Sequence, residues 1–236
     1  MPEQKQVCRS CGNKGSGKYC NSCGQPFGVK RLTVSGIWHE IFHFFTHLDK
    51  GFPYTLKKLI TEPGKMQREY IEGSRQNHQK PFSMYFLCLS IAALSIYWIN
   101  YTLMHYFDAG DTHEGAFFDK YWVILQICLF PLFASIPYLI FRRFQYNFAE
   151  ISVMMMYFFS FIFVLLIVIH LLKFIWPELQ TRYIELPMFY LYTTITYVNF
   201  FNKGKKLFVV VSAMISITLA FILAMWIQDL LVELFT

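Results

Sequence analysis

Four cysteines near the amino terminus carry the clearest chemical signal in this sequence. They stand in two steps, Cys8-x2-Cys11 and Cys20-x2-Cys23, and a glycine follows each step. In such a knuckle two sulfurs reach one ion, and four thiolates at about 2.3 Å complete a tetrahedral zinc site with no position left open for catalysis. We therefore predict one structural zinc ion, Zn2+, in an N-terminal ribbon over residues 1–28 whose folding depends on the metal.

Two other uses of these cysteines are weighed against zinc. A redox CxxC pair is typical of a βαβ unit, which the sequence does not predict here. Two disulfides would need an oxidising compartment. The remaining cysteines, Cys88 and Cys128, lie inside apolar runs and are interpreted as small buried hydrophobic residues.

A second metal-binding pattern is the string His39-Glu40-x-x-His43. On a helix the two histidines would share a zinc ion and Glu40 would activate its water, as in zinc metalloproteases. Glu62 stands where a downstream carboxylate ligand could follow. The alternative, which we favour, is that these histidines form the polar face of a helix at a membrane surface.

The composition points to a membrane protein. Of 236 residues, 55% are hydrophobic, 19% aromatic and 15% charged, against about 25% charged in soluble domains. Four apolar stretches have the roughly 20 residues that a helix needs to cross a bilayer: 82–106, 121–141, 151–175 and 207–227. A further stretch, 186–201, is shorter and rich in Tyr and Thr. We predict an all-α integral membrane protein with a five-span bundle over 82–236, of which the fourth span is the shortest.

The basic residues predict the orientation of these spans. Residues 1–81 hold thirteen Lys and Arg, and the loops 142–150 and 202–206 hold five more, whereas the loop 108–120 is acidic. Because cytoplasmic loops are enriched in Lys and Arg, the N-terminus is predicted in the cytoplasm and the C-terminus outside. The first long apolar run starts near Phe82, too late for a signal peptide. A reducing cytosol would also keep the thiols free for zinc.

Residues 29–81 predict cytoplasmic amphipathic helices at the membrane interface. Helical patterns cover 35–51, 52–60 and 61–73, with Pro53 in a first turn and Gly73 at an end. Basic residues on such helices attract anionic headgroups, at about 1 kcal/mol each. Arg68, Arg75 and Lys80 are the candidate lipid-contacting residues. The favoured alternative is a salt-bridged network at the interface.

The spans carry few polar groups. No carboxylate lies deep within them, which disfavours proton-coupled pumping. Tyr190, Thr194 and Tyr197 share one face of the fourth span, a pattern that favours interhelical hydrogen bonds. A polar cavity beside this span, in a transporter or lipid-handling protein, is the alternative.

The order of motifs resembles a bacterial family of unknown function, number 3667 in the domain-of-unknown-function series. The motifs are a CxxC…CxxCGQ head, then "HLDKGFPYTLKKLITEPGKMQREYIEGSR", then "KPF" and a run of spans, with the most specific similarity over residues 47–82. The resemblance implies a zinc-ribbon protein of the bacterial inner membrane and implies no reaction.

Together these patterns favour a non-catalytic scaffold, interaction or membrane-organising protein. The ribbon is expected to dock a protein partner or to brace the interfacial helices. Nucleic acid is the weaker partner, because Tyr19 is the only aromatic residue of the ribbon before Phe27 and offers a poor stacking platform. A membrane-associated metalloprotease using Glu40 is the main alternative, and a transporter or lipid-handling protein is a further one.

Overall fold

The computed structural model describes residues 6–28, 33, 51–107 and 113–235. Its elements in chain order are β1 (Gln6–Val7), β2 (Lys14–Gly15), α2 (Phe52–Thr61), α3 (Lys65–Glu72), α4 (Pro81–Phe107), α5 (His113–Ile140), the 3-10 turn η1 (Arg142–Phe144), α6 (Phe148–Leu171), the 3-10 turn η2 (Leu172–Phe174), α7 (Arg182–Phe200) and α8 (Lys206–Phe235). The helix predicted over 35–51 lies outside the described residues.

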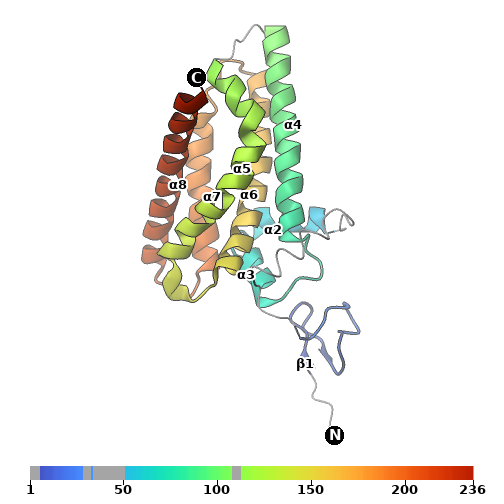
Figure 1. The fold of residues 1–236 in the computed structure, drawn as a ribbon. Helices are drawn as coiled ribbons and strands as arrows, with labels where there is room; N and C mark the ends of the chain where they lie inside the picture. The colour runs from blue at the N-terminus through green and yellow to red at the C-terminus, as the bar shows by residue number, and fades with distance from the viewer. Residues whose placement is uncertain (1–5, 29–32, 34–50, 108–112, 236) are drawn as a thin grey trace.

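The long helices α4 to α8 run side by side as an up-and-down bundle (Figure 1). The cysteine-rich head and the short helices α2 and α3 lie at one end of this bundle, and the C-terminal end of α8 lies at the other. We call the end that carries α2 and α3 the base. Apart from the short β1–β2 pair, which joins Gln6 to Gly15 and Val7 to Lys14, the described elements are helical.

Within the described residues, four helical stretches are long and apolar enough to cross a membrane. They are Pro81–Tyr106, Val123–Ile140, Phe148–Phe174 and Lys206–Ile227. These stretches match four of the five predicted spans. The predicted fourth span falls on α7, which has 19 residues and runs beside α6 and α8 but is not among the four.

Helix α6 is the centre of the bundle. It begins at a capping box, in which the side chain of Asn147 accepts from the backbone N–H of Glu150 (2.8 Å) and the Glu150 carboxylate accepts from the backbone N–H of Asn147 (2.9 Å). Such a box satisfies N–H groups that the first turn leaves unpaired. From this start α6 packs against α4, α5 and α7.

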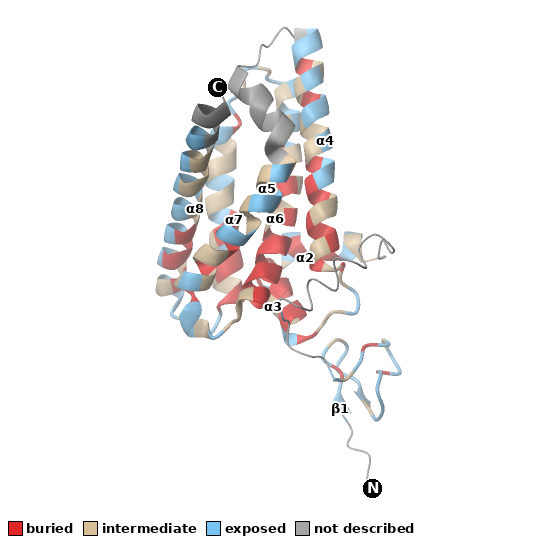
Figure 2. Ribbon diagram, in the orientation of Figure 1, coloured by how far each residue is buried: buried red, intermediate tan, exposed pale blue. Residues whose placement is uncertain are grey.

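Burial is concentrated at the base (Figure 2). The first half of α6 is almost fully buried, and the last turns of α7 bury Thr196, Tyr197 and Phe200. Tyr157, Phe163 and Phe200 are among the largest enclosed side chains. Helices α2 and α3 add Leu59 and Met66, both with no exposed surface. The core therefore sits where the short helices meet the long ones.

The short helices follow the sequence signals closely at most of their ends. Pro53 lies in the first turn of α2, and Gly73, with a φ of 119°, ends α3 as predicted. The third helix starts later than the pattern over 61–73 predicts, at Lys65, because Gly64 adopts a φ of 79° and forces a turn between α2 and α3. That these helices contact lipid stays a prediction.

Candidate metal centre and its attachment to the bundle

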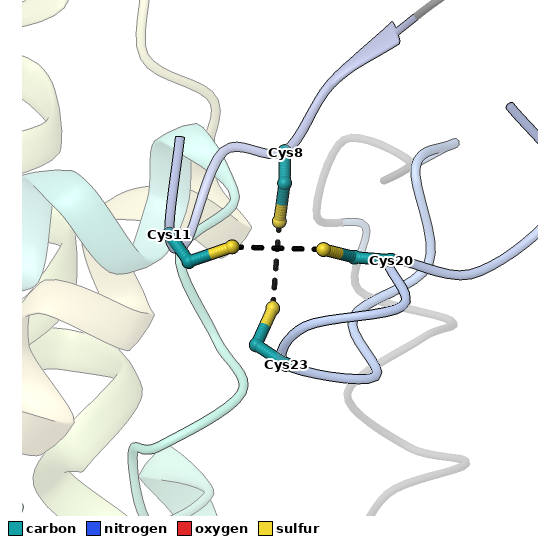
Figure 3. A group of neighbouring side chains, drawn as sticks. All are labelled: Cys8, Cys11, Cys20 and Cys23. Atoms are coloured by element: carbon teal, nitrogen blue, oxygen red, sulfur yellow. Dashed lines mark hydrogen bonds between the residues drawn. The ribbon is translucent and has the colours of Figure 1, made fainter. Parts of the chain in front are cut away.

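The four predicted ligand cysteines converge on one point (Figure 3). Their sulfur atoms all lie within 4.8 Å of one another, with Cys8 Sγ 3.5 Å from Cys23 Sγ and Cys11 Sγ 3.5 Å from Cys20 Sγ. Four thiolates about 2.3 Å from a tetrahedral ion stand about 3.8 Å apart, so the spacing fits a single metal ion. Within the described part of the chain, this is the one group of His, Cys, Asp and Glu residues that could hold a metal.

Each pair of cysteines sits on a knuckle with the same backbone pattern. The N–H of Gly12 donates to Cys8 O (2.9 Å), and the N–H of Gly24 donates to Cys20 O (2.8 Å). Both glycines have φ near +75°, at 75° and 74°, which residues with a Cβ adopt only at a cost. A glycine after each CxxC step therefore permits the backbone turn of the knuckle.

The knuckles favour the thiolate form at the first cysteine of each pair. Backbone N–H groups of Cys11 and Ser10 point at the Cys8 sulfur and lower its pKa to about 6. Those of Cys23 and Ser22 lower the pKa of Cys20 in the same way. Since the thiolate is the form that binds metal, these backbone groups favour metal binding at Cys8 and Cys20. Although a backbone N–H of Gln25 lowers it, burial and the neighbouring cysteine sulfurs raise the pKa of Cys23 to about 12.

The ribbon is attached to the end of α3 by Gln25, a residue that the sequence analysis did not single out. This side chain is only 2% exposed. Its amide NH2 donates to Gly73 O, and its amide oxygen accepts from the backbone N–H groups of Arg75 and Gln76, both at 3.2 Å. Arg9 adds a bond from its guanidinium to Glu72 O (2.7 Å). These contacts satisfy carbonyl groups that the end of a helix leaves unpaired.

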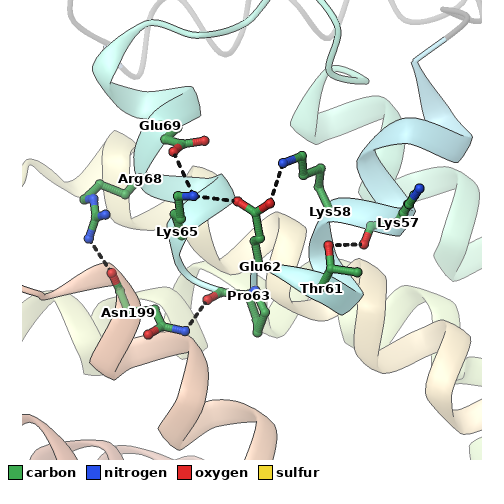
Figure 4. A network of polar contacts seen from close by, with 9 residues as sticks. All are labelled: Lys57, Lys58, Thr61, Glu62, Pro63, Lys65, Arg68, Glu69 and Asn199. Carbon is green, nitrogen blue, oxygen red and sulfur yellow. Dashed lines mark hydrogen bonds and ion pairs between the residues drawn. The ribbon is translucent and has the colours of Figure 1, made fainter.

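The turn between α2 and α3 is fitted against the end of α7. A Cβ on Gly64 would overlap the backbone oxygen of Thr196 and lie 2.9 Å from the backbone nitrogen of Phe200. Asn199 closes the contact from both sides: its side-chain amide donates to Pro63 O (2.9 Å), and its own carbonyl accepts from Arg68 (Figure 4). The string "EPGK" therefore has a structural reason, because only glycine permits this approach.

Glu62, the predicted third ligand of the metalloprotease site, is held by two lysines (Figure 4). Its carboxylate lies 2.5 Å from Lys58 Nζ and 2.9 Å from Lys65 Nζ. Hydrogen bonds from these two ammonium groups lower the pKa of Glu62 to about 2. The other residues of that site, His39, Glu40 and His43, lie outside the described residues.

The predicted lipid-contacting residues make protein contacts at the base. Arg68 bonds Asn199 and lies 3.9 Å from the Glu72 carboxylate. Arg75 donates from Nε to Tyr70 O (3.1 Å), and its guanidinium lies 5.6 Å from the centre of the Tyr70 ring. Lys80 stands directly before α4 and is half-buried. A role for these three residues toward lipid is untested by these contacts.

Comparisons with known proteins give one match, which lies on the segment that builds the base. No curated protein and no solved structure matches the chain. Residues 49–93, which span α2, α3 and the first turns of α4, match the family model described as Protein of unknown function (DUF3667), and this match confirms the resemblance predicted from the sequence.

Proposed function

We propose that this protein is a non-catalytic interaction or scaffold protein of a membrane, in which a zinc-loaded ribbon is presented on the cytoplasmic base of a five-span bundle. The observation that carries the proposal is the convergence of four cysteine sulfurs within 4.8 Å. A site closed by four protein ligands has no position for a substrate or a reactive water. Its role would therefore be to fold and hold the ribbon.

Zinc is the metal that this ligand set favours. Four thiolates in tetrahedral array suit zinc or iron–sulfur chemistry, and zinc alone needs no further inorganic atoms. The ribbon has few side chains to form a core, with Cys8, Cys20 and Gln25 its buried residues. The free energy of metal binding would then supply most of its folding.

The position of charge supports a cytoplasmic base. Arg9 and Lys203 line one cavity at this end, together with the η1 residue Phe144, so the ribbon and the loops predicted to be cytoplasmic lie together. Because basic loops stay in the cytoplasm, the head and base would face it, and α8 would end outside. The inner membrane of a bacterium is the proposed location.

The docked ribbon supports an interaction role. Gln25 and Arg9 fix it on the carbonyl end of α3, while the side chains of Tyr19, Lys14 and Lys18 remain exposed. A rigidly held module with an exposed outer surface suits a protein partner. Anionic lipid is the second partner proposed for the base.

The test is metal analysis of purified full-length protein. Wild type should hold one zinc ion per chain, and the double variant Cys8→Ser/Cys11→Ser should hold none. Cys128→Ser is the matched control, since Cys128 lies outside the cluster and, contrary to the interpretation from the sequence, is exposed on α5.

Two results would contradict the proposal. Equal zinc in wild type and the double variant would show that the ribbon is not the site, and two zinc ions per chain would favour the metalloprotease alternative.

A second experiment tests the interaction role. An affinity pull-down from native membranes compares the proteins that bind wild type with those that bind the double variant. Identical partners would remove the ribbon from the interaction.

A further inference from the structure

A cavity of about 410 Å³ opens at the base between the α2–α3 turn and the link from α7 to α8. This volume falls in the range of roughly 300–1,000 Å³ that small-molecule sites occupy. Lys65 and Arg68 line it from α3, and Lys206 lines it from the first residue of α8. Three cationic side chains from two separate parts of the chain thus surround one space.

The charge in this cavity is only partly neutralised by the protein. Glu62 is the one acidic residue in its lining, and its carboxylate is already shared between Lys58 and Lys65. Two carboxylates outside the lining offset part of the remaining charge: Glu69 lies 3.8 Å from Lys65 Nζ, and Glu72 lies 3.9 Å from Arg68 Nε. Lys206 forms no ion pair with any residue that the structure describes. The lining therefore carries an excess of positive charge that an anion would balance.

The lining combines polar and apolar groups. Asn199 and Asn202 add polar side chains to the cationic ones, and Val198, Phe201 and Val209 add apolar side chains from the end of α7 and the start of α8. Lys206 is also the first residue of the apolar stretch Lys206–Ile227. The cavity therefore lies at the level where α8 passes from a polar link into its membrane-compatible part.

We propose that this cavity binds a phosphate group, with Lys206, Lys65 and Arg68 as its cationic contacts. Guanidinium and ammonium groups form charge-assisted hydrogen bonds to phosphate oxygens, and those of arginine can be bidentate. An anionic phospholipid headgroup is one source of this phosphate, since the apolar residues of the lining could contact its glycerol end. Free phosphate in solution is the other source. The site is independent of the metal centre, and its lipid form rests on the proposal above that anionic lipid is a partner of the base.

The test uses purified full-length protein in a non-ionic detergent, stripped of native lipid. Short-chain phosphatidylglycerol, short-chain phosphatidylcholine and inorganic phosphate are each titrated, and the shift of the thermal unfolding midpoint gives the affinity. Lys206→Gln and Lys65→Gln should each weaken binding about tenfold, the effect of one lost charge-assisted contact.

Lys205→Gln is the matched control. Lys205 is the exposed neighbour of Lys206 and does not line the cavity, so this variant should change affinity by no more than about twofold. The unfolding midpoint without ligand shows whether each variant is folded. If Lys206→Gln does not fold, Lys65→Gln tests the cavity in its place.

Comparing the three ligands distinguishes a lipid headgroup from free phosphate as the bound group. Stabilisation by phosphatidylglycerol that Lys206→Gln weakens, with no response to inorganic phosphate, supports a lipid headgroup. A response to inorganic phosphate that Lys206→Gln weakens supports free phosphate. Two outcomes would overturn the proposal. In the first, Lys205→Gln loses as much affinity as Lys206→Gln. In the second, both lipids stabilise the protein equally, and neither Lys206→Gln nor Lys65→Gln changes that stabilisation.

Discussion

The base and the far end of the bundle are built on different principles. At the base, large side chains such as Tyr157 and Phe163 are at most 1% exposed. Toward the far end of α4, Trp98 is 55% exposed and Tyr106 is 80% exposed. The helices are continuous from one end to the other, so the contrast comes from what surrounds them.

Polar bonds between distant segments set the base apart. Tyr157 on α6 donates to Gln79 O (2.5 Å), and Tyr192 on α7 donates to Leu59 O (3.2 Å). These bonds tie the ends of the α2–α3 segment to the long helices, because backbone groups buried away from water require partners. The base therefore resembles the core of a soluble domain, in which side chains pack in one fixed arrangement. The outward faces of the far end are instead compatible with contact to fluid lipid chains.

The sharpest way to break the base is Gly64→Ala. A Cβ at this position would overlap Thr196 O, and the backbone φ of 79° already disfavours a side chain. Because the obstacle is backbone on both sides, we expect a loss of more than about 4 kcal/mol in the free energy of unfolding. The measurement is the thermal unfolding midpoint and the monodisperse yield in detergent.

Gly12→Ala is the matched control for that change. Gly12 has nearly the same φ, 75°, but nothing lies within 4 Å of its Cβ position. Backbone strain alone costs about 1–2 kcal/mol and would be confined to the ribbon. An equal effect of both substitutions on the midpoint of the bundle would show that strain, and not the contact with α7, makes Gly64 necessary.

Gln25→Ala should separate the ribbon from the base. It would leave Gly73 O and the N–H groups of Arg75 and Gln76 without their partner, at a cost of about 2–3 kcal/mol in docking. Hydrogen exchange at the Arg75 and Gln76 amides should become faster, with the metal content unchanged. Asn21→Ala, at an exposed ribbon position, is the control. Unchanged exchange in Gln25→Ala would mean that the attachment rests elsewhere.

The pH dependence of stability should also report on the base. Burial, with a smaller contribution from the charge of Lys58, lowers the pKa of His78 from 6.5 to about 4. The folded state therefore favours the neutral ring, and the stability it contributes is present above pH 6.5 and lost as pH falls toward 4. We expect a loss of about 1–2 kcal/mol, reduced by partial exposure of the ring.

Glu62 provides an internal comparison for this titration. Its pKa falls from 4.5 to about 2, so its contribution is present above pH 4.5 and is lost only as pH falls toward 2. His78→Phe, which keeps a ring beside Tyr54 and Tyr70, should abolish the first loss and keep the second. Persistence of the loss between pH 6.5 and 4 in this variant would assign it to another group.

The sequence predicted best those features that depend on local pattern. The spacing of Cys8, Cys11, Cys20 and Cys23 predicted a cluster, and proline and glycine marked most ends of α2 and α3. The polar face of α7 was also confirmed, since the Tyr190 hydroxyl lies 2.8 Å from Thr218 Oγ1 on α8. Each of these follows from residue spacing within one segment.

What escaped prediction depends on pairs of segments far apart in the chain. Gln25 follows the second knuckle, but nothing near it specifies that Gly73 is its acceptor. Asn199 ends an apolar helix and meets Pro63 through a contact that spans 136 positions. The sequence signal for both residues was their position, directly after a motif for Gln25 and at the end of an apolar helix for Asn199. That signal does not identify the hydrogen-bond partner of either side chain.

The smallest expected effect tests whether the exposed faces of the long helices contact lipid. Leu94 on α4 is 60% exposed, whereas Leu89, on the same helix, has no exposed surface. If exposed faces contact hydrocarbon, Leu94→Ala removes contacts that lipid chains replace, and the free energy of unfolding should change by less than about 0.5 kcal/mol. Leu89→Ala should cost about 2–5 kcal/mol through the cavity it leaves. A loss in Leu94→Ala as large as in Leu89→Ala, measured in lipid nanodiscs, would mean that this face of α4 packs against protein.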